Sequence, residues 1–371
     1  CRPPKMKPAG VTLNFSGSFD GLFKDFAASG QLNTDIGQAE MDMKMDLTKG
    51  VQAAEYSGTL KLVDFDLGKW SNNKDFGLIT FNAEVPRGKG LRLIDLNTDL
   101  LAEVDKFNYK GYEYSNFKME GRIIQSTFNG DFAISDENVK LDFLGIVDLS
   151  NELPIINVEA NVEQLDLAAT KLTERDLLVS GAGFINIQNY NLRRLEAQLN
   201  VENFKIIESD SIVYTLDSLD AYANAADTLN REIFIESDIG HAEISGNYDI
   251  LQLWPKLKNE ILDYYPVFGK KVGFKSSQRD LNDQMFISKV ELTNTSNWTF
   301  FFDEKLDTIK DTHLDIYWDD MRDSFHLDFF SPNIHYGPHT VEEGFAYLYT
   351  NNGISNAVVG GDKITISDRF T

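Results

Sequence analysis

The stretch Met41-Asp42-Met43-Lys44-Met45-Asp46-Leu47 decides the fold class, because apolar and polar residues alternate at every position over seven residues. Alternation with a period of two describes a β-strand with one apolar face and one solvated face. Such strands belong to antiparallel sheets, since parallel strands are buried on both faces and read as continuous apolar runs. The same pattern recurs at residues 11–15, 139–143, 156–162, 195–201, 219–225 and 326–329.

The overall composition excludes several classes of protein. The chain has 371 residues, with 35 Lys and Arg against 58 Asp and Glu, which gives a formal net charge of −23. Its 42% hydrophobic residues are too many for a disordered chain at this charge. The acidity argues against a nucleic-acid partner, which requires stripes of Lys and Arg, and against a surface that lies flat on anionic lipid. No apolar run approaches the length of a transmembrane helix.

A second regularity is a triplet in which an apolar residue and a small or polar residue precede glycine. The triplets end at Gly17, Gly58, Gly121, Gly130, Gly145, Gly181 and Gly246. Glycines inside strands would let neighbouring backbones approach and the sheet curve, whereas glycines at strand ends would only mark turns. Both interpretations are open from the sequence.

Helix is scarce, and the best candidate covers residues 249–265. Its apolar residues recur at steps of three and four, at Ile250, Leu253, Trp254, Leu257, Ile261, Tyr264 and Tyr265. Asp249 can cap the start, Pro255 suits only the first turn, and Pro266 is expected to end the helix. Residues 167–172 are a weaker candidate for a helical turn. We therefore divide the chain into a β-groove segment at 1–249, a helix-containing interruption at 250–285 and a continuing β-groove segment at 286–371.

The apolar face of so many strands must be covered. At about 10–13 residues per strand and turn, the chain would form about 25–30 strands. Helices are too few to cover them, which leaves a second sheet, closure, or an apolar ligand such as acyl chains. We predict an all-β fold, a long curled antiparallel sheet that forms a groove, with one short amphipathic helix.

The candidate groove residues are the apolar members of the clearest strands. They are Val11, Leu13, Phe15, Met41, Met43, Met45, Leu47, Val139, Leu141, Phe143, Ile156, Val158 and Val162. The alternative role for each is the core of a self-packed sandwich. A metal-thioether site is the weaker interpretation of the methionines, because Met at strand spacing is an ordinary packing residue.

The sequence contains no pattern that favours an enzyme. His335 and His339 have metal-like spacing only on a helix, and Gly337 and Pro338 between them indicate a turn. Asp315, Asp319, Asp320 and Asp323 lack the glycine and spacing of a calcium loop and suggest a solvated turn. Because there is also no nucleophile elbow and no phosphate loop, we predict a protein that is not an enzyme and has no cofactor or metal.

The only cysteine, Cys1, allows two interpretations. It is either the lipidated first residue of a mature lipoprotein or an arbitrary start of the sequence. The lack of any further cysteine favours an envelope or periplasmic chain.

Several stretches resemble the repeat units of TamB-like translocation and assembly module proteins. They are residues 17–37, 56–60 with 65–69, 107–114, 141–149 and the helical stretch that ends at Tyr264-Tyr265-Pro266. The resemblance is long and diffuse, covers most of residues 10–350, and brings no catalytic motif.

This resemblance implies a fragment of a periplasmic bridge, akin to AsmA-like and bridge-like lipid-transfer proteins. It implies phospholipid transport between the inner and outer membranes, help with outer-membrane protein assembly, or both. The implied partners are phospholipid acyl chains and an outer-membrane β-barrel assembly protein, with membrane anchors outside this chain. The alternative is a lipid-anchored cell-surface β-sandwich adhesin or binding module.

Overall fold

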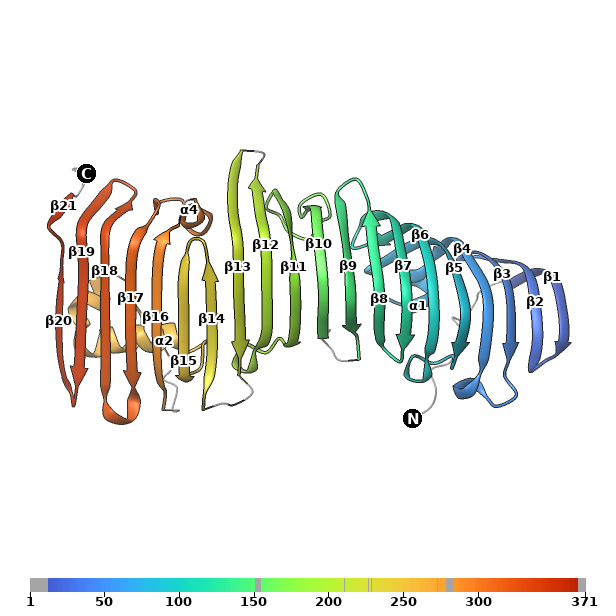
Figure 1. The fold of residues 1–371 in the computed structure, drawn as a ribbon, viewed down its shortest axis with the longest axis horizontal. Helices are drawn as coiled ribbons and strands as arrows, with labels where there is room; N and C mark the ends of the chain where they lie inside the picture. Colours follow the sequence, from blue (N-terminus) through green and yellow to red (C-terminus); the bar gives the residue numbers. More distant parts are fainter. Residues whose placement is uncertain are drawn as a thin grey trace. The chain divides into compact units, whose positions relative to one another are not determined.

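The chain folds almost entirely into antiparallel β-structure (Figure 1). The computed structural model describes residues 13–150, 155–209, 211–225, 227, 229–271, 273–277, 283–295 and 297–365. These residues form 21 strands and four short α-helices, and every strand pair with a described register is antiparallel. The all-β fold class is therefore confirmed, and the sheet is open, without closure into a barrel. The strands are fewer than expected because many are long, up to 14 residues in Phe76–Lys89.

The chain divides into two compact units. Unit 1 contains residues 1–183 and 206–211, and unit 2 contains residues 184–205 and 212–371. The predicted boundaries at residues 249 and 285 both lie within unit 2 and remain predictions.

Unit 1 is a meander in which each strand pairs with the next along the chain. Its strands are β1 (Leu13–Leu22), β2 (Asp25–Thr34), β3 (Gly37–Asp46), β4 (Glu55–Asp66), β5 (Phe76–Lys89), β6 (Asn97–Tyr109), β7 (Tyr112–Ile124), β8 (Thr127–Ser135), β9 (Val139–Asp148), β10 (Ile155–Asp166) and the first part of β11 (Leu177–Asn189). Its one described α-helix, α1 (Leu67–Ser71), directly follows β4. Residues 167–172, expected as a helical turn, form a hydrogen-bonded turn in which the Leu172 N–H donates to the Leu167 carbonyl at 2.9 Å.

Unit 2 combines further strands with three helices. The strands are the rest of β11, most of β12 (Glu196–Glu208), β13 (Ile212–Asn224), β14 (Arg231–Ser237), β15 (Gly240–Asn247), β16 (Met285–Asn294), β17 (Lys310–Asp319), β18 (Ser324–Tyr336), β19 (His339–Asn351), β20 (Ile354–Gly360) and β21 (Lys363–Thr365). The helices are α2 (Leu253–Tyr264), α3 (Pro266–Lys271) and α4 (Trp298–Phe302). The expected turn between His335 and His339 is present, since Tyr336 pairs with His339 across it.

The recurrent glycines lie inside strands, so the interpretation that they mark strand ends is wrong. Gly121, Gly130 and Gly145 are direct neighbours across β7, β8 and β9. Gly145 has a φ of +149°, and a Cβ there would overlap the Asn157 carbonyl oxygen and lie 2.7 Å from the Val158 Cα. Only glycine fits this close approach of two backbones without strain.

The predicted helix forms, with three differences. It begins at Leu253 with Pro255 in its first turn, as expected, but Gln252 occupies the capping position. Asp249 instead accepts a hydrogen bond from the Leu251 N–H at 3.1 Å and pairs with Arg193 at 2.7 Å. Pro266 ends α2 but also starts α3, because proline suits the first turn of a helix. Trp254 is 56% exposed, so it lies outside the buried stripe.

The acidic cluster is a turn, as predicted, but it is not fully solvated. Asp319 is only 2% exposed and pairs with Arg322 at 3.0 Å. Asp320 accepts hydrogen bonds from the Trp318 indole Nε1 at 2.8 Å and from the Gln284 N–H at 2.6 Å. It also pairs with Lys256 of α2, so this turn helps to attach the helix to the sheet.

Candidate functional site

One face of unit 1 is apolar across ten consecutive strands, and we call it the apolar face. The strand registers align its side chains in rows that run across the sheet. One row consists of Phe15, Leu32, Ala39, Leu62, Phe81, Val104, Phe117, Ile134, Leu141 and Val162. The next consists of Gly17, Gly30, Met41, Leu60, Ala83, Ala102, Met119, Phe132, Phe143 and Ala160. Flanking rows add further apolar residues and the glycine neighbours of β7–β9.

Most of the predicted groove residues belong to this face. Strand register places there Phe15, Met41, Met43, Met45, Leu141, Phe143, Ile156, Val158 and Val162. Val139 alternates with Leu141 on β9, and Leu47 follows the last residue of β3. Val11 and the side chain of Leu13 lie outside the described residues.

The side chains of the apolar face are mostly half-buried. Phe15 is 43% exposed, whereas Val139 and Val158 are only 2% and 6% exposed. The other predicted residues with described side chains fall between these values. The rings of Phe132 and Phe143 stack at 5.0 Å, and described ring contacts between strands in unit 1 join neighbouring strands. The rows therefore form a continuous apolar surface that keeps part of its area accessible.

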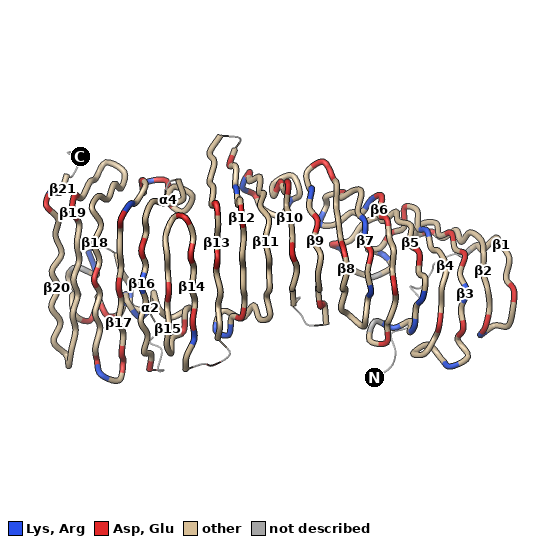
Figure 2. The backbone as a smooth tube through the Cα atoms, viewed as in Figure 1, with Lys and Arg blue, Asp and Glu red and all other residues tan. Residues whose placement is uncertain are grey.

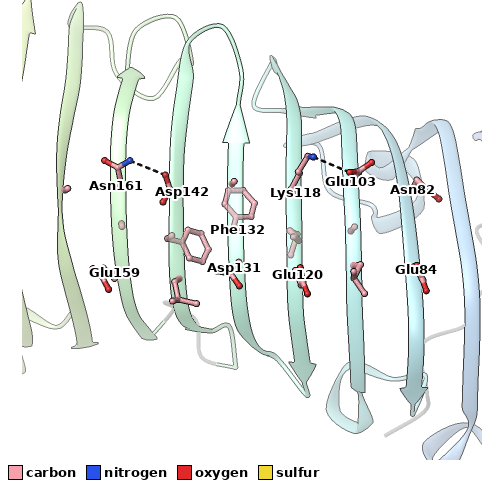
Figure 3. A pocket seen from close by; sticks show the side chains of 18 of the residues that line it. Asn82, Glu84, Glu103, Lys118, Glu120, Asp131, Phe132, Asp142, Glu159 and Asn161 are labelled. Carbon is pink, nitrogen blue, oxygen red and sulfur yellow. Dashed lines mark hydrogen bonds and ion pairs between the residues drawn. The ribbon is translucent and has the colours of Figure 1, made fainter.

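The opposite face of unit 1 is polar and carries a hollow. The hollow has a volume of about 730 Å³, and its lining residues come from β5 to β11 (Figure 3). Its lining includes the carboxylates of Glu84, Glu103, Glu120, Asp131, Asp142 and Glu159. One cation of the lining, Lys118, pairs with Glu103 at 3.4 Å. The lining also includes Phe143 and four other members of the second apolar row, Ala102, Met119, Phe132 and Ala160, so the hollow shares residues with the apolar face.

Acidic side chains recur along the strands of both units (Figure 2). In unit 1 they alternate with the apolar rows, so a strand such as β9 presents Leu141 and Phe143 to one face and Asp142 and Leu144 to the other. The negative charge of the unit is thus concentrated on the polar face.

The corresponding apolar surface of unit 2 is covered by helix α2 (Figure 1). Phe286, Trp318 and Phe325 are neighbours across β16, β17 and β18, and with Tyr248 they form a buried cluster. Leu253 and Leu257 of α2 pack against this cluster. Unit 2 therefore shows how this type of sheet face is closed when a helix is present.

A carboxyl group lies at the contact between α2 and the sheet. Glu260 lines a small space between α2 and the sheet, together with Tyr264 of α2, Phe325 and Leu348. Burial, together with the negative charges of Asp323, Asp263 and Asp320, raises the pKa of Glu260 to about 7. The docked helix therefore binds a proton at Glu260 more tightly than the unfolded chain does.

This proton linkage predicts a pH dependence for unit 2. Because the native pKa is raised, Glu260 favours folding below the unfolded-state value, and this contribution is lost as pH rises towards about 7. We expect Glu260→Gln to stabilise unit 2 more at pH 8 than at pH 5. Urea unfolding followed by circular dichroism at both pH values measures the difference. The exposed Glu304→Gln is the matched control, and an equal response of both variants to pH would contradict the assignment.

Comparisons with protein-family models, curated proteins and solved structures gave no match. Among the described residues, no group of His, Cys, Asp and Glu is arranged to hold a metal ion. None of the helices in the described ranges has the length and apolar character needed to cross a bilayer.

Proposed function

We propose that the apolar face of unit 1 carries the acyl chains of phospholipids, as a segment of a bridge in the cell envelope. The observation that supports this is the continuous set of apolar rows over β1–β10, with side chains that remain partly accessible. Each large apolar side chain left in water forgoes about 1.5–3 kcal/mol of transfer free energy, which acyl chains would recover. The headgroups would stay in water along the edges of this face.

The sequence resemblance to TamB-like and AsmA-like proteins also supports this proposal. In this proposal, the chain lies in the periplasm as part of a longer protein that is anchored by segments outside this sequence. In this proposal, phospholipids move along the apolar rows between the inner and outer membranes, and an outer-membrane β-barrel assembly protein is a partner at one end. No step requires bond chemistry, and the proposed role is that of a carrier and not of an enzyme.

A substitution pair on β9 tests the proposal. Leu141 lies on the apolar face, and Leu144 lies on the polar face of the same strand, where it is 54% exposed. We expect Leu141→Glu to lower the amount of bound phospholipid by roughly tenfold or more, because a carboxylate placed among acyl chains is left without a partner. Met43→Glu on β3 should act in the same way.

The measurement is mass spectrometry of phospholipid that co-purifies with the protein, together with circular dichroism to verify the fold. Leu144→Glu adds the same charge to the same strand and should leave lipid binding unchanged. If Leu141→Glu unfolds unit 1 and wild-type protein carries no lipid, the apolar face is the core of a sandwich and the proposal is wrong.

A further inference from the structure

The segment from Leu253 to Lys275 carries a net positive charge, opposite in sign to that of the whole chain. It contains five lysines, Lys256, Lys258, Lys270, Lys271 and Lys275, against only Glu260 and Asp263. The chain as a whole has a formal charge of −23. A local excess of positive charge in such an acidic protein attracts negatively charged partners to this segment.

The contacts of the segment distinguish a side of α2 that faces the sheet from a side that faces away from it. Leu253 and Leu257 of α2 pack on the buried cluster, and Lys256 pairs with Asp320. On the other side, the ring of Phe274 meets Trp254 edge-on at 5.8 Å, and the Ser277 N–H donates to the Asn259 side-chain oxygen at 2.9 Å. α3 and the residues after it therefore fold back along the outer side of α2.

This outer side combines cations with exposed apolar groups. Trp254 is 56% exposed and Val267 is 82% exposed. Lys270, Lys271 and Lys275 are exposed, and within the part of the chain that the structure describes they form no ion pair. The Lys258 ammonium lies 5.9 Å from the centre of the Trp254 ring.

We propose that the surface formed by Trp254, Lys258, Val267, Lys270, Lys271 and Lys275 docks on an anionic phospholipid bilayer. Exposed lysines are attracted to anionic headgroups, and tryptophan prefers the boundary between headgroups and acyl chains. Salt screens the repulsion from exposed acidic residues that lie farther than about 8 Å from this surface. At this segment the proposal departs from the expectation that the acidity of the chain argues against a surface that lies flat on anionic lipid.

Flotation of the purified chain with vesicles tests the inference. We expect binding to phosphatidylcholine vesicles in which phosphatidylglycerol makes up about a third of the lipid, and no binding to phosphatidylcholine alone. The triple variant Lys270→Gln, Lys271→Gln, Lys275→Gln should bind roughly a hundredfold more weakly, since each lysine contributes roughly fivefold. Trp254→Ala should weaken binding by roughly tenfold.

A second triple variant, Lys289→Gln, Lys305→Gln, Lys310→Gln, removes the same charge from exposed positions elsewhere in unit 2. It should retain binding, and an equal loss in both triple variants would overturn the inference. Binding to polyglutamate without binding to vesicles would instead assign the surface to an acidic protein. The inference does not rest on the proposed lipid-carrying function, because Leu141→Glu should leave vesicle docking intact.

Discussion

Trp318→Ala is expected to destabilise unit 2 by about 3–5 kcal/mol, the range for removing a large buried aromatic side chain. Trp318 is 6% exposed, stacks on Phe286 at 6.0 Å and meets Phe325 edge-on at 4.8 Å. Its loss leaves a cavity under α2 and removes the indole hydrogen bond to Asp320. Urea unfolding followed by circular dichroism measures the change in the free energy of unfolding.

Two variants locate the source of this effect. Trp318→Phe keeps an aromatic ring but loses the hydrogen bond. It should lower the free energy of unfolding by less than Trp318→Ala does. Trp254→Ala removes the same side chain from a position of the same unit that is 56% exposed, and it should change stability by about 1 kcal/mol or less. If Trp254→Ala and Trp318→Ala destabilise equally, the cluster beneath α2 does not hold unit 2 together.

Gly145→Ala is expected to destabilise unit 1 by about 2–5 kcal/mol, from backbone strain and overpacking together. The added methyl group would overlap the neighbouring strand at Asn157, and the φ of +149° is unfavourable for any residue with a Cβ. The expected result is loss of the pairing between β9 and β10, measured by hydrogen exchange and by urea unfolding.

The matched control for Gly145 is Gly50→Ala in the same unit. Gly50 also has a positive φ, +84°, but its nearest neighbour to an added Cβ is the Gln52 side-chain oxygen at 3.4 Å. Gly50→Ala should lower the free energy of unfolding only through the strain of a positive φ, by about 1–2 kcal/mol. If both variants lose the same free energy of unfolding, the close approach of the strands at Gly145 does not contribute to stability.

The alternating pattern of the sequence predicts the all-β class, but not the number of strands or the whole apolar face. The pattern at Met41, Met43 and Met45 is regular because β3 pairs with β2 and β4 without interruption. Phe81 and Val104 belong to the same face but were missed. The pairing of β5 with β6 shifts register at several points, and each shift breaks the period of two that makes a strand recognisable.

The parts that depend on distant contacts could not be predicted from periodicity. The spacing of Trp254 suited the buried stripe of the helix, yet the fold-back of Phe274 holds it on the outer side. Asp320 looked like a solvated turn residue, and it is Lys256 of α2, distant in the sequence, that gives it an ionic partner. The hollow has no sequence signature, because its lining comes from seven strands that only the strand pairing brings together.

The direct pairing of β15 with β16 has a consequence for how such a chain could evolve. Asn247 and Met285 are partners in this ladder, although α2 and α3 lie between them in the sequence. The whole helical excursion is therefore an insertion at one hairpin, and it changes no other strand pair. In a meander, one insertion or deletion at a hairpin can therefore add or remove a helical segment that covers the sheet. The pairing of all other strands stays unchanged.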